Sequence, residues 1–130
     1  MIFEESVVLE MDFDEALEAV KSELAASGFG TLTQIDLQAT LRDKVGTEMD
    51  RYVIVGACNP KLASAAIAAD PLIGVLLPCN VVVREVAAGV QVDAMDPGLM
   101  ASMTGDDRLG PVAEEARELI SGALQRMMQR

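Results

Sequence analysis

The sequence predicts an α+β fold, in which about five strands form an antiparallel sheet with helices packed on it. Three observations lead to this prediction. The order of expected elements is β-α-β-(α)-β-α-β-β-α, with helices towards both ends of the chain. Two strands are adjacent in this order and joined by a tight turn, as in a hairpin. No repeat or linker interrupts the chain, so we expect one domain over residues 1–130.

The first helix has signals at both of its ends. It follows a strand expected at residues 3–10, and Asp12 is a suitable N-cap with Glu15 completing a capping box. Gly28 ends the helix, and Phe29 supplies the hydrophobic contact that accompanies such an end. The apolar positions between them recur at helical spacing. They are Phe13, Ala16, Leu17, Val20 and Leu24.

The middle of the chain alternates strands with short helices. Residues 31–36 alternate apolar and polar side chains, which is typical of a half-buried strand. Asp36 caps a short helix that Gly46 ends. Residues 51–57 are rich in β-branched side chains and predict a central strand.

Two further strands and the last helices follow. Asn59 and Pro60 begin an Ala-rich helix as N-cap and first residue. Residues 75–86 give the strongest strand signal, and Pro78 is expected to bend this strand or make part of it an edge. A hairpin turn at residues 88–89 leads into a strand at 90–94. A short helical turn starts at residue 96, and a final helix follows Gly105.

Composition limits the classes of function. The chain has 130 residues, 51% of them hydrophobic, and a formal net charge of −11. This charge disfavours nucleic acid and anionic membrane surfaces, since both are bound through Lys and Arg. With no apolar stretch of membrane-spanning length and no secretory signal, we expect a cytoplasmic protein with reduced cysteines.

The sequence contains no histidine. A Ser-His-Asp or Cys-His catalytic arrangement and metal ligation by imidazole are therefore excluded. Whether the protein is an enzyme stays open, and no cofactor is indicated. Carboxylates are plentiful but lack a calcium-loop pattern, so we expect no metal site among them.

Two Cys-Asn blocks form the candidate site, which consists of Cys58, Asn59, Cys79 and Asn80. Each block lies at the end of a strand or at a kink in one. If the two strands are antiparallel neighbours, the thiols face each other. Cys58 also precedes a helix N-terminus, which favours its thiolate form. The alternative is structural, because cysteine is often buried as a small apolar residue and Asn59 is explained as a cap.

Several segments together resemble the domain-of-unknown-function 302 family. They are Gly28-Phe29-Gly30, Ile35-Asp36, Thr40-Leu41, Gly56-Ala57-Cys58-Asn59-Pro60, Leu76 to Val83 and Asp96-Pro97. The resemblance implies a fold similar to the TATA-binding-protein-like arrangement β-α-β(4)-α with added short helices. It also implies a homodimer. It implies no activity, because none is established for the family.

Three hypotheses of function remain at this point. The first is a small-molecule- or cofactor-binding homodimer with its site near the Cys-Asn blocks. The second is a thiol-based redox or metal-handling protein that uses Cys58 and Cys79. The third is a non-enzymatic interaction module with an apolar face formed by the valine-rich strand and the methionines, which include Met95, Met100, Met103, Met127 and Met128.

Overall fold

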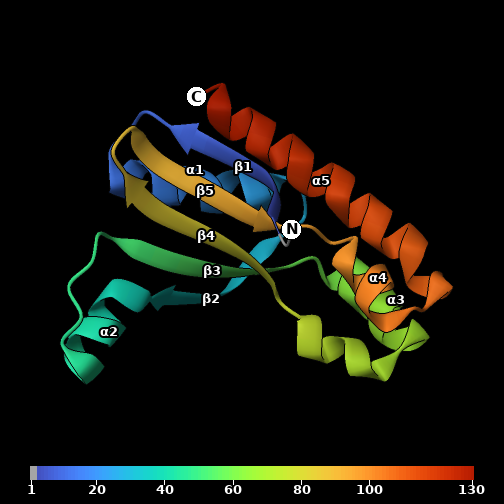
Figure 1. The fold of residues 1–130 in the computed structure, drawn as a ribbon. Helices are drawn as coiled ribbons and strands as arrows, with labels where there is room; N and C mark the ends of the chain where they lie inside the picture. Colours follow the sequence, from blue (N-terminus) through green and yellow to red (C-terminus); the bar gives the residue numbers. More distant parts are fainter. Residues whose placement is uncertain (1–2) are drawn as a thin grey trace.

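The computed structural model of the protein describes the backbone of residues 3–130 and the side chains of residues 5–130. It confirms the α+β fold: five strands form one antiparallel sheet in the order β1-β5-β4-β3-β2 (Figure 1). The strands are β1 (Phe3–Leu9), β2 (Gly30–Asp36), β3 (Tyr52–Cys58), β4 (Cys79–Val86) and β5 (Gly89–Met95). The helices are α1 (Phe13–Ala26), α2 (Leu37–Val45), α3 (Pro60–Ala69), α4 (Leu99–Thr104) and α5 (Gly110–Met128), with 3-10 turns η1 (Pro71–Leu76) and η2 (Asp107–Leu109).

The expected ends of α1 are confirmed. The Asp12 carboxylate accepts a hydrogen bond from the Asp14 amide at 3.2 Å. At the other end Gly28 has a φ of 87°, which suits a residue without a Cβ. The Phe29 amide donates to the Leu24 carbonyl at 2.8 Å, and the Phe29 ring is buried. Local sequence signals therefore place α1 correctly.

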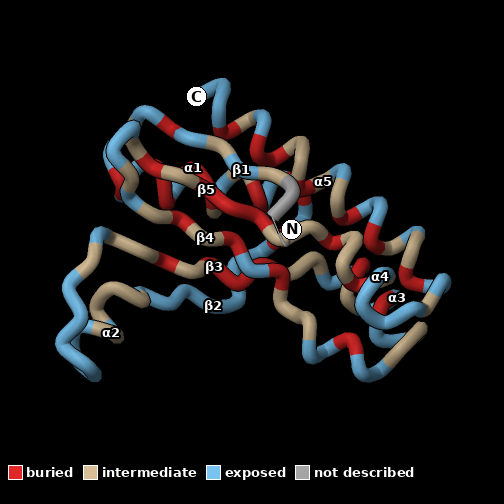
Figure 2. The backbone as a smooth tube through the Cα atoms, in the orientation of Figure 1, coloured by how far each residue is buried: buried red, intermediate tan, exposed pale blue. Residues whose placement is uncertain are grey.

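The main core lies between one face of the sheet and the helices α1 and α5 (Figure 2). Arg126 joins the two helices: its Nε lies 3.0 Å from Glu23 Oε1, and its guanidinium donates to Ser27 Oγ at 2.6 Å. The sheet contributes every second residue of its inner strands to this core, namely Val53, Val55, Ala57, Cys79, Val81, Val83, Val90, Val92 and Ala94.

The four elements α3, η1, α4 and η2 pack together around a smaller apolar cluster. We call these four elements the helical lobe. The buried members of the cluster are Ala66, Ile73, Met100, Leu109 and Ala113, the last of these from α5. The lobe lies beyond the sheet end at which β3 finishes and β4 begins (Figure 1). The structure thus has two apolar centres with the ends of these strands between them.

The strand expected at residues 31–36 is present, but the prediction that it is half-buried is wrong. All seven residues of β2 are exposed, including Leu32 at 65% and Ile35 at 45%. The physical reason is its place at the sheet edge, where β3 is its only strand neighbour among residues 3–130. The pairing also shifts register between Thr31 and Thr33, as at a β-bulge.

The strand expected from residue 75 is wrong in its first part. Residues 71–76 form the 3-10 turn η1, a cis peptide bond joins Leu77 to Pro78, and β4 begins only at Cys79. Asp70 starts η1 by accepting from the Leu72 amide at 3.0 Å. A short apolar run fits a strand and a helical turn equally well, so its periodicity could not separate the two.

The other face of the sheet carries a polar network. In Figure 1, α1 lies behind the sheet, and β3, β4 and β5 face the viewer without a helix in front. Asp93 on this face is only 8% exposed and accepts hydrogen bonds from Ser6, Gln91 and Arg84 at 2.7, 2.8 and 3.0 Å. Burial alone raises the pKa of Asp93, but these bonds outweigh it and hold the pKa below its usual value.

Candidate functional site

The structure brings the two Cys-Asn blocks together. β3 and β4 are antiparallel neighbours, with Ala57 opposite Cys79 and Gly56 opposite Asn80. Cys58 therefore lies one position beyond the residue opposite Cys79, at the end of β3. Cys58 also lies close enough to raise the pKa of Cys79.

Both cysteines line one cavity between the sheet and the helical lobe. The volume open to the centre of a water molecule is about 20 Å³, which is room for about one water. The walls are almost entirely apolar. They are formed by Phe29, Ala57, Cys58, Asn59, Leu62, Ala63, Ala66, Leu77, Cys79, Met100, Val112 and Ala116.

Burial, and to a lesser extent the neighbouring Cys58, raises the pKa of the Cys79 thiol to about 11. Cys79 is 6% exposed, whereas Cys58 is half-buried. At neutral pH Cys79 is therefore a neutral thiol and a poor nucleophile. The redox hypothesis needs a thiol of lowered pKa, and Cys79 has the opposite shift.

The two asparagines have different positions. Asn59 caps α3, since its Oδ1 accepts from the Leu62 amide at 3.2 Å, and it also lines the cavity. A Cβ added to Gly28 would lie 3.0 Å from Asn59 Nδ2, so the end of α1 abuts this side chain. Asn80 is exposed and is not among the residues that line the cavity. The site thus contains three of the four expected residues.

Sequence reasoning missed the helical wall of the cavity. The residues Phe29, Leu62 and Met100 lie far apart in the sequence. The apolar pattern around each of them indicates only that the residue belongs to a core. The one available signal for Met100 was its membership of the late methionine cluster.

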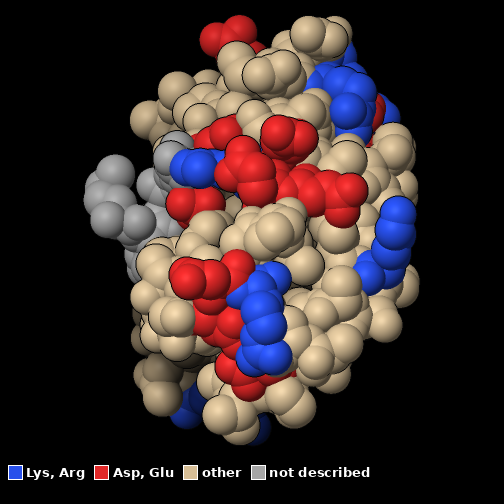
Figure 3. Space-filling view, turned by 90° about the vertical axis from the view of Figure 1, so that its right-hand side faces the viewer, with Lys and Arg blue, Asp and Glu red and all other residues tan. Residues whose placement is uncertain are grey.

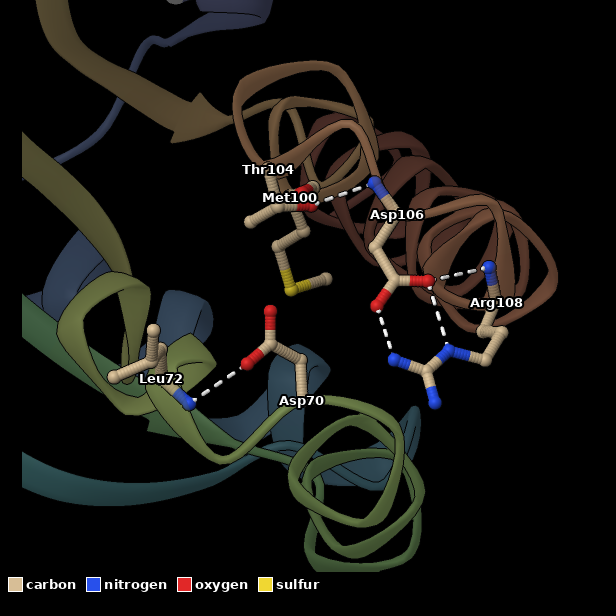
Figure 4. A network of polar contacts seen from close by, with 6 residues as sticks. All are labelled: Asp70, Leu72, Met100, Thr104, Asp106 and Arg108. Carbon is tan, nitrogen blue, oxygen red and sulfur yellow. Dashed lines mark hydrogen bonds and ion pairs between the residues drawn. The ribbon is translucent and has the colours of Figure 1, made fainter.

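Polar contacts around α4 and η2 hold the lobe in shape (Figure 4). Thr104 Oγ1 donates to the Met100 carbonyl and accepts from the Asp106 amide at 3.3 Å. The Asp106 carboxylate accepts two bonds from the Arg108 guanidinium, at 3.0 and 2.7 Å. The hydrogen bonds from Arg108 lower the pKa of Asp106. Met100 is thereby fixed on a short helix whose turns are closed by side chains.

Charge is unevenly distributed on the lobe side of the molecule. In Figure 3, which views the right-hand side of Figure 1, acidic side chains gather in groups with fewer basic ones beside them. Among the side chains of residues 5–130, however, no three of His, Cys, Asp or Glu come together as a metal site would require. Nor is any helix there long and apolar enough to cross a bilayer.

Apolar side chains also remain exposed away from the cavity. Leu72 and Val75 on η1 are 77% and 85% exposed. The interaction-module hypothesis places its apolar face on the methionines and the valine-rich strand; the exposure of these two side chains identifies no partner, so that hypothesis stays a prediction.

Comparison with known proteins agrees with this geometry. The sequence pattern described as "Domain of unknown function DUF302" matches residues 5–127. The chain belongs to the DUF302 family. A crystal structure of an uncharacterized conserved DUF302 protein from Bacillus stearothermophilus is 25% identical and superposes with a TM-score of 0.89, covering 97% of this chain and 98% of that one. No curated protein matches. The DUF302 fold is therefore shown over nearly the whole chain.

Proposed function

We propose that this protein binds a small ligand in the cavity between the sheet and the helical lobe. One observation carries the proposal. Segments near residues 29, 58 and 79, which are far apart in sequence, converge with α3, α4 and α5 on a single apolar cavity that holds both cysteines. Apolar cavities with a few polar or reactive groups are the usual form of a ligand site.

The size of the cavity constrains the ligand. In the form described here there is room for about one water molecule. A larger ligand enters only if the helical lobe moves away from the sheet. The apolar cluster of the lobe includes Ala113 of α5, so such a shift also involves the start of that helix.

Thermal shift measurements with haem, flavin mononucleotide and pyridoxal phosphate test this proposal. Ala63 lines the cavity and is half-buried, so Ala63→Phe fills it; Ala65 lies exposed on the same helix, so Ala65→Phe is the matched control. We expect a probe that stabilises the wild type and Ala65→Phe but not Ala63→Phe. Probes that never shift the melting temperature, or that act equally on both variants, would count against a site at this cavity.

We also propose that the protein is a homodimer that works in the cytoplasm. β2 is an edge strand whose residues are all exposed, and Leu32, Ile35 and Val45 leave apolar surface on and beside it. An exposed edge without charge between Gly30 and Ile35 pairs readily with a second copy about a two-fold axis. Two free thiols in one cavity suit a reducing compartment.

A further inference from the structure

The cavity brings together three sulfur-bearing side chains from three different elements. Cys58 ends β3, Cys79 begins β4 and Met100 lies on α4, and all three line the same space. The other polar side chain in the wall is Asn59, whose Oδ1 is occupied by the Leu62 amide. The soft electron-pair donors among the side chains of the wall are two thiols and a thioether.

We propose that the cavity binds a soft monovalent metal ion, Cu(I) or its analogue Ag(I), through Cys58 Sγ, Cys79 Sγ and Met100 Sδ. This inference rests on the proposed function, because it names the ligand of the same cavity. Thiolate and thioether sulfur are the ligands that select Cu(I) over harder ions. Met100 is 3% exposed and packs with Ala66 and Ile73, so its thioether is held inside the molecule.

The dimensions of the cavity suit an ion better than an organic molecule. A volume of about 20 Å³ holds one atom-sized guest without any movement of the lobe. Zinc is a poor fit, because structural zinc takes four N, S or O ligands, and the described side chains of residues 5–130 bring no three of His, Cys, Asp or Glu together. A site of two cysteines and one methionine matches the lower coordination number of Cu(I).

Binding exchanges protons for the ion and transfers no electrons. Each thiol releases its proton to solvent as its sulfur binds the metal, and copper remains Cu(I) throughout. The product carries one negative charge, which the N-terminus of α3 beside Cys58 offsets. Because both thiols must lose a proton to bind the ion, the apparent affinity rises with pH.

Anaerobic Cu(I) titration against the chromophoric chelator bathocuproine disulfonate tests the inference. We expect one ion per chain, and loss of this binding in Cys58→Ser and in Cys79→Ser. Met100→Leu preserves volume and apolarity, so it keeps the fold while weakening the affinity by at least about tenfold. Met103→Leu on the same helix is the matched control, since the Met103 side chain is 66% exposed. This variant should bind Cu(I) with the affinity of the wild type.

Three results would overturn the inference: no ion retained against the chelator, equal affinity in Met100→Leu and wild type, or Zn(II) bound as tightly as Cu(I). The circular dichroism and melting temperature of each apo variant verify folding. If haem, flavin or pyridoxal phosphate stabilises the wild type but not Ala63→Phe while Cu(I) is not retained, the metal inference fails and the ligand site stands. If Cu(I) is not retained and no probe acts, both fail.

Discussion

At the scale of single residues, the burial of Cys79 should make the free energy of unfolding fall as the pH rises in the alkaline range. Its pKa is raised from 9.0 to about 11, so the folded chain keeps a proton that the unfolded chain loses. This contribution is complete below pH 9.0 and is lost as pH rises towards 11. We expect the wild type to lose about 3 kcal/mol of unfolding free energy over this range through Cys79 alone.

Urea unfolding under reducing conditions at several alkaline pH values measures this loss. Cys79→Val is the control, because it keeps an apolar side chain of similar size but cannot ionise. Apart from Cys58, which interacts with Cys79, the other groups titrate alike in both proteins, so the difference between the two pH curves reports on Cys79 and this interaction. Parallel curves would contradict the raised pKa.

Gly56 is a second residue where a single atom matters. A Cβ there would overlap Thr33 Oγ1 and lie 2.9 Å from Pro78 Cγ. Gly56→Ala should therefore cost about 1–3 kcal/mol of unfolding free energy through overpacking. Gly30, with nothing within 4 Å of its added Cβ, is the matched control, and Gly30→Ala should change stability by less than about 0.5 kcal/mol. Chemical denaturation compares them; equal effects would mean that the contact at Gly56 relaxes freely.

At the scale of elements, the two asparagines of the Cys-Asn blocks have separable roles. Asn59 caps α3, so Asn59→Ala should lower the unfolding free energy by about 1 kcal/mol, while Asn59→Asp keeps the acceptor and the stability. Asn80 is exposed on β4, and Asn80→Ala should have little effect. Thermal and urea unfolding of the three variants check this; an equal loss in Asn59→Asp and Asn59→Ala would exclude the cap as the cause.

Elements whose ends are marked by local chemistry were predictable from the sequence. α1 begins and ends, and α3 begins, where the caps and the Gly28 signal place them, because those signals act within a few residues. β2 and residues 75–78 were misjudged, because exposure at a sheet edge and the choice between strand and 3-10 turn depend on tertiary neighbours. The adjacency of Cys58 and Cys79 followed from strand pairing, whereas that of Met100 depends on how the helical lobe folds back onto the sheet.

At the scale of the whole molecule, an acidic chain has a sheet edge at β2 that is largely free of charge. Its net charge of −11 keeps copies apart in general, whereas residues 30–35 of β2 carry no charge. Pairing of β2 with its symmetry mate would join two five-stranded sheets and cover Leu32 and Ile35. The exposed backbone edge and the exposed apolar side chains would be satisfied by the same contact.

Light scattering coupled to size exclusion should therefore give twice the 13.8 kDa mass of one chain, and the melting temperature should rise with protein concentration. Ile35→Lys places a charge on each side of the paired edges and should yield monomers, because like charges across strands repel. Val75→Lys changes a side chain that is 85% exposed on η1 and should leave the mass unchanged. A wild type that is monomeric at all concentrations would refute the dimer, and a dimer that survives Ile35→Lys but not Val75→Lys would place the interface on η1 instead.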